Sequence, residues 1–237
     1  MREILLGDHH VHSSFSDDAV STLEDNVAAA STAGLRELRL VDHVRTSTTW
    51  VPEFLAAVRA LDVPDGLTVL SGVEAKILNA SGDLDIPSLP SDVGRILIAD
   101  HQFPGSDGPW SPSETLERLA AGLRVDDALD LLIEGLVRAV RRHPGNQLAH
   151  CFSILPKIGI DASQLGRERL DEWAQAAAET DTVVEINEKW ACPQPPAVEA
   201  AVTAGVTLVA STDSHDARDV GRYERVVEII DAIAEDA

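Results

Sequence analysis

Short apolar runs alternate with longer segments of helical pattern along the whole chain, and this alternation limits the folds it can adopt. Several runs, such as Val206–Ala210, are apolar on both sides of the strand alternation, which is typical of strands buried on both faces. The runs that predict strands are Glu3–Asp8, Leu38–Asp42, Leu67–Glu74, Ile96–His101, Gln147–Cys151, Thr182–Asn187 and Val206–Thr212. Such an alternation favours an α/β fold, either a parallel barrel or a doubly wound sheet, and periodicity alone does not choose between them.

The segments between these runs carry helix start and stop signals. Ser21–Glu24 has the pattern of a capping box, and the helix it opens should end near Gly34. Ser111 followed by Pro112 predicts the start of another helix, and the chain from there to Arg142 should form two helices broken near Gly122. Further helices are predicted at Ser163–Glu179, Pro196–Ala204 and Asp219–Ala234.

Length and charge narrow the class of protein further. The 237 residues show no repeat or long linker, and 44% of them are apolar, so we expect one domain over residues 1–237. A net charge of −21 argues against a stable nucleic-acid complex and against docking on anionic membranes. No run approaches the ~18 apolar residues of a membrane span. With no secretion signal and two cysteines, we expect a cytoplasmic protein.

Histidines and carboxylates gather where the predicted strands end. The first strand ends in Asp8-His9-His10-Val11-His12, and strand alternation places His10 and His12 on one face. Other strands end in Asp42-His43, Gly72-Val73-Glu74, Asp100-His101, Ala149-His150 and Asp213-Ser214-His215. In α/β folds the carboxyl ends of the strands carry the functional sites, so these side chains should meet at one rim.

A lone histidine is more often a packing or surface residue than a ligand, and we interpret His9 and His143 in that way. The set at the strand ends is different because so many imidazoles and carboxylates in one place need a compensating positive charge. Neutral imidazole and carboxylate are natural ligands of divalent cations. The sequence therefore predicts a metal site at the rim.

These residues, in this order, resemble the PHP (polymerase and histidinol phosphatase) superfamily, and most closely its small stand-alone YcdX-like phosphatases. The motifs that carry the resemblance are His10-Val-His12, Ser16-Asp17, Asp42-His43, Gly72-Val-Glu74, His101, His150, Glu185-Ile-Asn187 and Asp213-Ser-His215. The resemblance implies a distorted (β/α)7 barrel with a trinuclear metal site at its C-terminal rim.

The resemblance also implies which residues hold each ion. His10, His12, Glu74 and Asp213 would bind the first metal, and Glu74 would bridge to a second metal completed by His101 and His150. Asp17, His43 and His215 would bind the third. Asp18 competes with Asp17 for that role, and we favour Asp17 on its spacing. Cys151 follows His150 but faces the opposite side of the strand, so we expect a buried packing thiol.

The chemistry implied is hydrolysis of a small phosphate monoester, histidinol-phosphate-like or nucleotide-like, by a hydroxide bridging two of three divalent ions. Mixed nitrogen and oxygen ligands accept Zn²⁺, Mn²⁺ or Fe²⁺. Glu74, Asp213 and His215 are the predicted catalytic residues. An amidohydrolase using a similar metal rim is an alternative, although the fourth strand lacks the lysine typical of that class. A non-catalytic, metal-stabilised binding module is the second alternative.

Basic and aromatic residues near the motifs are candidates for substrate contacts. Arg218 and Lys157 are the preferred pair for binding phosphate oxygens. Arg45, Lys76 and Lys189 are further candidates. Trp50, Trp110 and Trp190 should lie on loops at the rim, whereas Trp173 should lie in a helix core. We also expect the helical segment 104–145 to cover part of the rim.

Overall fold

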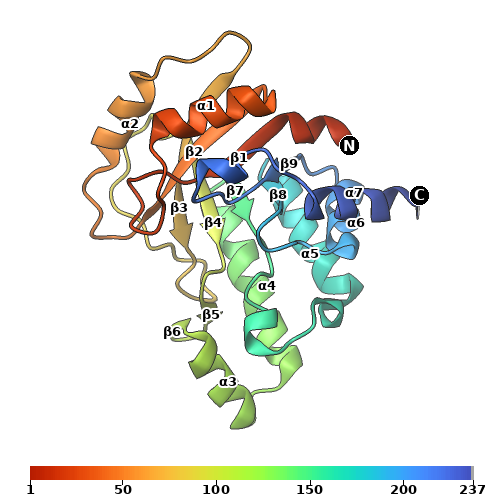
Figure 1. The fold of residues 1–237 in the computed structure, drawn as a ribbon. Helices are drawn as coiled ribbons and strands as arrows, with labels where there is room; N and C mark the ends of the chain where they lie inside the picture. The colour runs from red at the N-terminus through yellow and green to blue at the C-terminus, as the bar shows by residue number, and fades with distance from the viewer. Residues whose placement is uncertain (236–237) are drawn as a thin grey trace.

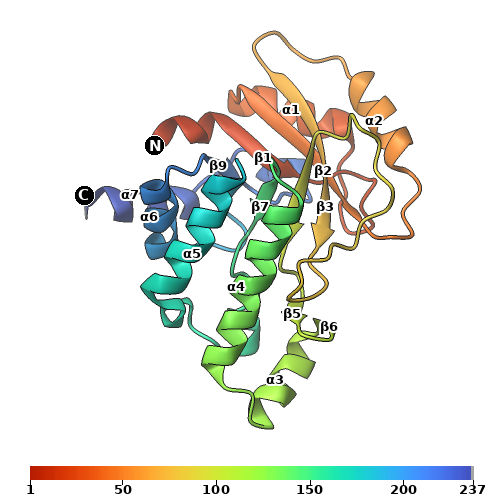
Figure 2. The same cartoon turned by 180° about the vertical axis from the view of Figure 1, so that it is seen from behind.

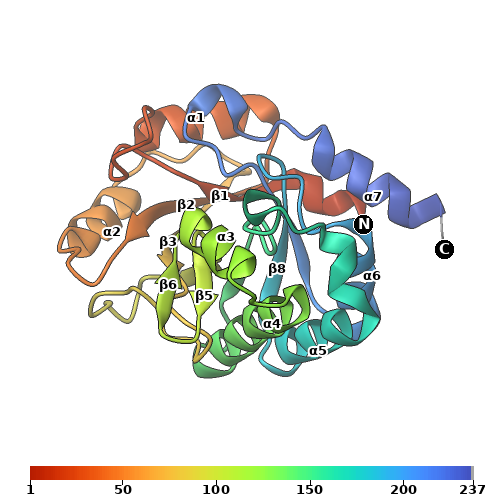
Figure 3. The same cartoon turned by 90° about the horizontal axis from the view of Figure 1, so that it is seen from below.

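Seven parallel strands form the central sheet of the computed structural model, which describes residues 1–235. In spatial order they are β1 (Gly7–Val11), β2 (Glu37–Val44), β3 (Thr68–Lys76), β4 (Arg95–Ala99), β7 (Gln147–Ala149), β8 (Val183–Asn187) and β9 (Leu208–Ser211). The sheet curves until its two edge strands approach one another, as Figure 3 shows along the barrel. Parallel pairing of Val11 with Ser214 joins the β1 side to the chain after β9, and the His12 amide donates to the Ser214 carbonyl at 2.8 Å. The barrel is therefore nearly closed, which confirms the barrel prediction over the doubly wound sheet.

Helices surround the barrel (Figures 1 and 2). They are α1 (Leu23–Ala33), α2 (Val51–Arg59), α4 (Val125–Arg142), α5 (Gly166–Glu179), α6 (Pro195–Ala204) and α7 (Arg225–Glu235). A short hairpin of β5 (Phe103–Gly105) and β6 (Gly108–Trp110) and the helix α3 (Pro112–Ala120) extend beyond the carboxyl ends of the strands (Figure 1). Four single-turn 3₁₀ helices are η1 (Arg2–Leu6), η2 (Pro156–Ile158), η3 (Ala162–Leu165) and η4 (Ala217–Asp219).

The helix signals in the sequence act as predicted, with one shift. The capping box of α1 uses Thr22 and Asp25, one residue later than the predicted pair, and Gly34 ends the helix with a φ of 74°. Ser111 caps α3 by accepting from the Glu114 amide. Gly122, with a φ of 112°, breaks the chain between α3 and α4 as expected.

Three predictions of secondary structure were wrong or incomplete. The expected strand Glu3–Asp8 begins only at Gly7 because its partner β2 starts at Glu37, which pairs with Gly7, and the preceding residues form η1 instead. The segment Asp219–Ala234 becomes helical only from Arg225, after η4. Sequence patterns also missed α2 and the β5–β6 hairpin, whose strands are each three residues long.

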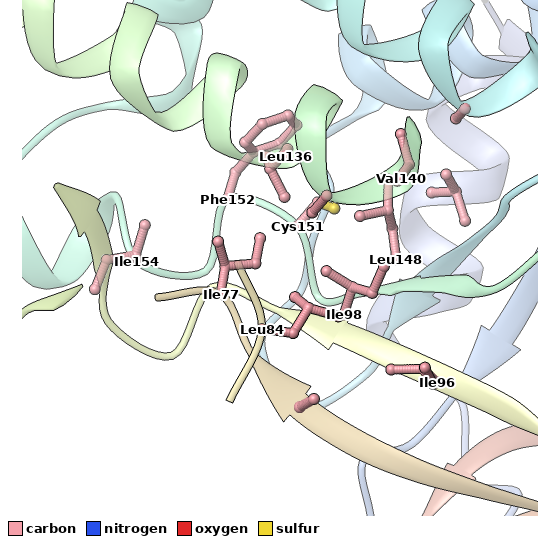
Figure 4. Close-up of a cluster of buried hydrophobic side chains, with 14 of the residues drawn as sticks. Ile77, Leu84, Ile96, Ile98, Leu136, Val140, Leu148, Cys151, Phe152 and Ile154 are labelled. Carbon is pink, nitrogen blue, oxygen red and sulfur yellow. The ribbon is translucent and has the colours of Figure 1, made fainter. Parts of the chain in front are cut away.

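Most of the apolar core lies between the strands and the outer helices. Figure 4 shows part of it, where Ile98 and Leu148 of the sheet face Leu136 and Val140 of α4. The thiol of Cys151 lies in the same cluster, which confirms that it is a buried packing residue. The interior of the barrel holds a second, smaller cluster of Val41, Leu97, Ala99 and Ala149. Above this cluster, toward the carboxyl ends of the strands, the barrel is filled by polar side chains.

The segment 104–145 divides into two parts. The hairpin and α3 stay beyond the strand ends, whereas α4 returns along the outside of the barrel (Figure 2). α4 is an ordinary outer-layer helix, with one face buried over nine residues. The expectation that this segment covers the rim therefore applies only to its first part.

Candidate metal centre

The two histidines of the first strand point to one spot inside the barrel. His10 and His12 are both fully buried, and their Nε2 atoms lie 3.0 Å apart. Asp213, which follows β9, places its Oδ1 3.3 Å from the His12 Nε2. The φ of 54° at Asp213 turns the chain sharply at this position and brings the carboxylate toward β1. The first and last strands of the barrel thus supply the two sides of one ligand group.

The hydrogen bonds of these imidazoles indicate which nitrogen is free. The His10 Nδ1 donates to Glu185 at 3.1 Å, because an ionised carboxylate has no hydrogen to give. The hydroxyl of Ser16 donates to Asp42 at 2.7 Å and so accepts from the His12 Nδ1 at 3.3 Å. In the neutral rings both Nε2 atoms then carry lone pairs that face each other at 3.0 Å. Such lone pairs repel unless a proton or a metal ion lies between them.

Glu74, at the end of β3, lies at the centre of five imidazoles. Its Oε2 lies 3.4 Å from the Nε2 of both His10 and His12 and 2.9 Å from the Nδ1 of His43. Its Oε1 lies 2.9 Å from the Nε2 of both His101 and His150. The carboxylate is only 1% exposed, and its Oε2 has no hydrogen-bond partner among residues 1–235. One oxygen facing each of two imidazole groups is the arrangement of a bridging carboxylate ligand.

A third group lies nearer the solvent. His12, His43 and His215 bring ring nitrogens within ligand distance of one another. The Asp18 carboxylate lies 3.5 Å from the His43 Nε2 and 3.3 Å from the His215 Nε2. Asp17 has no recorded ion pair within the described chain, although it lies on the rim of the same cavity. The contacts therefore favour Asp18 over Asp17, which we preferred from its spacing.

A second layer of buried carboxylates holds the ligands in place. Glu185 accepts hydrogen bonds from His10, from the His150 amide at 2.8 Å, and from Gln147 and Asn187, each at 2.8 Å. This role of Glu185 is not among those predicted from the sequence. The signal was present, since Glu185 precedes Asn187 on a fully buried strand, where a carboxylate must be paired.

Three other buried carboxylates, Asp100, Asp42 and Asp8, play similar parts. Asp100 accepts from the Ser153 hydroxyl at 2.9 Å and lies 3.5 Å from the His150 Nδ1. Asp42 accepts from the amide and hydroxyl groups of both Ser13 and Ser16 in the turn after β1. Asp8 ties β1 to the end of β9 by accepting from the amide and hydroxyl of Thr212. Such partners fix the orientation and tautomer of metal-binding side chains.

Burial and neighbouring charges shift the pKa values of the carboxyl groups in opposite directions. Burial raises the pKa of Asp8 and of Asp42 to about 6, against the hydrogen bonds each accepts. Burial also opposes ionisation of Glu74, but the surrounding imidazoles, His101 first, hold its pKa well below its ordinary value. Glu74 is therefore a carboxylate at neutral pH, the form that binds cations.

The imidazoles are shifted as well. Burial opposes protonation of His10, but the Glu185 and Glu74 carboxylates hold its pKa well above the ordinary value. Burial also opposes protonation of His150, but its contacts with Asp100 and Glu74 raise its pKa to about 10. Burial lowers the pKa of His12 to about 3. The buried carboxylates thus stabilise positive charge in this site, and bound metal ions can supply that charge in place of protons.

A cavity of about 450 Å³ opens above the cluster. Its walls include His43, Glu74, His101, Asp213 and His215 together with Asp17, Asp18, Val44, Arg45, Lys76, Asp85, Gln102, Lys189 and Trp190. Three of the predicted substrate-binding cations therefore lie on this cavity. Lys76 donates to Gln102 at 2.9 Å, and the Lys189 Nζ lies 3.2 Å from the His215 Nδ1.

Arg218 and Lys157, the pair preferred from the sequence, are not among the residues that line this cavity in the described chain. Arg218 is bound by both oxygens of Asp216, its side chain is 84% exposed, and within the described chain it is not among the residues on the cavity. Spacing alone could not show this pairing, because it depends on how the two side chains are directed. Lys157 is likewise not among the cavity residues of the described chain, but its Nζ lies 3.9 Å from the ring centroid of Trp190, which does line the cavity.

The four tryptophans lie in different surroundings. Trp190 lines the cavity, and its indole donates to Asp213 at 2.8 Å. Trp50 packs against Phe15 and Phe54, and Trp110 against Phe103 in the β5–β6 hairpin. Trp173 is buried in α5, as predicted. Only Trp190, of the three expected at the rim, therefore borders the site in the structure of residues 1–235.

A nearly closed parallel barrel with a histidine and carboxylate cluster at its C-terminal rim defines a class of metal-site proteins. The model of the PHP domain family matches residues 8–189, and the chain belongs to this family. The family, the barrel and the strand-end cluster predicted from the sequence are confirmed. No helix in residues 1–235 is long and apolar enough to cross a membrane.

Curated relatives cover nearly the whole chain. A probable phosphatase of Shewanella piezotolerans is 30% identical over 96% of this chain and 85% of its own length. The probable phosphatase YcdX of Shigella flexneri is 28% identical over 95% of this chain and 85% of its own. The prediction of a phosphatase-type hydrolase agrees with these names.

A solved structure shares the fold. The histidinol phosphate phosphatase of Lactococcus lactis, crystallised with zinc, L-histidinol and phosphate, superposes with a TM-score of 0.68. It covers 97% of this chain and 92% of its own length at 16% sequence identity. This likeness supports the barrel architecture described above.

Proposed function

We propose that the protein is a metal-dependent phosphoesterase that hydrolyses a small phosphate monoester, histidinol-phosphate-like or nucleotide-like. The observation that carries the proposal is the position of Glu74, a buried carboxylate whose two oxygens face two separate imidazole groups. The curated relatives named as probable phosphatases, and the zinc and phosphate bound by the Lactococcus enzyme of the same fold, support it.

The ligand sets follow from the contacts. His10, His12, Asp213 and Glu74 would hold one divalent ion, and Glu74, His101 and His150 a second. His43, His215 and Asp18 would hold a third, with Asp18 in the place first expected of Asp17. The donor set of imidazole and carboxylate suits Zn²⁺, Mn²⁺ or Fe²⁺. When bound, such ions supply Lewis acidity and activate water for attack on phosphorus.

The chain's own residues would bind and orient the ester. Lys189, Lys76 and Arg45 all line the cavity, so they can bind the phosphate oxygens that face away from the ions. The cavity of about 450 Å³ has room for a phosphate and a leaving group of modest size. Glu74, Asp213 and His215 would be required for turnover because each joins a ligand group.

The test is phosphate release from 4-nitrophenyl phosphate by protein stripped of metal and then reloaded. We expect stripping to abolish turnover and Mn²⁺ or Zn²⁺ to restore it. Glu74→Gln and Asp213→Asn should each lose more than about 100-fold in turnover. His143→Ala, at the end of α4, is the matched control and should behave as the parent chain. Unchanged turnover after stripping, or an equal loss in the control, would contradict the proposal.

A further inference from the structure

Trp190 is tied to the metal centre by more than its place on the cavity wall. It follows β8, and its backbone amide donates to the Asn187 side chain at 3.0 Å. The side chain is 37% exposed and lines two cavities, the one above the cluster and a second of about 740 Å³ between α5 and α6. Its backbone is therefore held by Asn187, and the residue borders two open spaces.

The indole nitrogen of Trp190 is hydrogen-bonded to only one of the two Asp213 carboxylate oxygens. It donates to the Asp213 Oδ2 at 2.8 Å, and the other oxygen, Oδ1, lies 3.3 Å from the His12 Nε2. The Asp213 side chain is only 5% exposed, so little water reaches it to replace a lost donor. An indole N–H can only donate, and this hydrogen bond therefore holds Oδ2 away from the cluster and aims Oδ1 into it.

The ring face carries a second interaction. The Lys157 Nζ lies 3.9 Å from the ring centroid, within the range of a cation–π contact, and the Lys189 Nζ lies at 5.9 Å. Lys189 in turn lies 3.5 Å from the Asp213 Oδ1. One side chain thus holds a carboxylate with its edge and a lysine with its face.

We infer that Trp190 is a positioning residue that orients Asp213 for metal binding through its N–H and holds the Lys157 ammonium group against its ring, beside the cavity wall that Trp190 forms. The inference rests on the proposed function in taking Asp213 as a metal ligand. It assigns the two effects to different parts of one side chain, so substitutions can separate them.

Trp110 offers a matched control. Its indole also donates to an aspartate, Asp107, and Arg118 lies 4.0 Å above its ring, yet it belongs to the β5–β6 hairpin and is not among the residues that line the cavity in the described chain. Trp110→Phe therefore removes the same kind of hydrogen bond at a place where no metal ligand depends on it.

The experiment measures zinc affinity by competition with a chromophoric chelator, and inhibition of 4-nitrophenyl phosphate turnover by inorganic phosphate. Trp190→Phe, which loses the N–H and keeps a ring, should weaken binding of one zinc equivalent by about 10- to 100-fold. Trp190→Leu should show the same loss of zinc affinity. It should also raise the inhibition constant of phosphate by about threefold or more, because the Lys157 ammonium group loses the aromatic ring against which it lies. Trp110→Phe should change neither quantity.

A double-mutant cycle excludes a merely structural effect. In an Asp213→Ala background, Trp190→Phe should cause no further loss of zinc affinity, because its effect passes through that carboxylate. Zinc affinity in Trp190→Phe equal to that of the parent chain, or the same fall in the Asp213→Ala background, would overturn the inference. If the parent chain binds zinc through Asp213 but releases no phosphate, the proposed function fails while the role of Trp190 in metal binding stands.

Discussion

Replacing Glu185 by glutamine tests whether this buried carboxylate sets the state of the metal ligands. Its Oε2 accepts from Gln147, its Oε1 accepts from the His150 amide and Asn187, and the His10 Nδ1 lies within hydrogen-bond distance of both oxygens. Glutamine has the same shape, but one of its two oxygens becomes an NH₂ group. With the NH₂ group at the Oε2 position Gln147 loses its acceptor, and with the NH₂ group at the Oε1 position the His150 amide and Asn187 both lose theirs.

The expected loss in free energy of unfolding follows from the number of buried donors left without an acceptor. Each buried donor left without a partner costs about 1–3 kcal/mol, so one or two such donors in Glu185→Gln should lower the free energy of unfolding by about 1–6 kcal/mol. If the NH₂ group faces His10, the ring can accept only by moving its proton to Nε2, the nitrogen needed for metal. Zinc affinity should then fall by about 10- to 100-fold.

The assay is urea unfolding of the metal-free protein, followed by zinc titration of the folded protein. Glu172→Gln, an exposed glutamate of α5, is the control and should stay within about 0.5 kcal/mol of the parent chain. A loss of unfolding free energy below about 1 kcal/mol together with unchanged zinc affinity would refute the reasoning, because it would mean that these donors find other partners.

Further predictions concern binding and packing. Zinc at 100 times its dissociation constant should stabilise the protein by about 2.7 kcal/mol and raise the Tm by about 5–10 °C in a calorimetric scan, and equal Tm values with and without zinc would contradict a folded-state metal site. Lys189→Ala should raise the KM for 4-nitrophenyl phosphate by about tenfold, whereas Arg218→Ala, already paired with Asp216, should leave it unchanged. Leu136→Ala should cost about 2–5 kcal/mol in urea unfolding because the side chain is fully buried, whereas Leu116→Ala, 45% exposed, should cost far less.

The barrel and the residues of its rim could be predicted because they depend on local patterns. An apolar run buried on both faces must be a strand of a covered sheet, and the carboxyl ends of parallel strands must meet at one edge. His10, Glu74, His150 and His215 therefore had to converge once the strands were placed. Because each motif follows a different strand, the order of the motifs along the sequence was enough to predict that these side chains meet.

Other features depend on contacts that no local pattern contains. The start of β1 at Gly7 follows from where β2 begins to pair with it, thirty residues further along the chain. The contacts that favour Asp18 over Asp17 as a candidate ligand depend on the course of an exposed turn relative to His43 and His215. The pairing of Arg218 with Asp216 is decided by side-chain geometry, which spacing alone does not give.

The near-closure of the barrel has a consequence for how the molecule is held together. The first and last strands meet through few backbone hydrogen bonds, and Asp8 and Thr212, bonded across this junction, are 204 residues apart. His10 and His12 lie on one side of the junction, and Asp213 and His215 lie on the other. Coordination of one ion by both sides would be a long-range cross-link, which restricts the unfolded chain most when the enclosed loop is long. Amide hydrogens of β1 and β9 should then be the ones whose exchange slows most when metal is added.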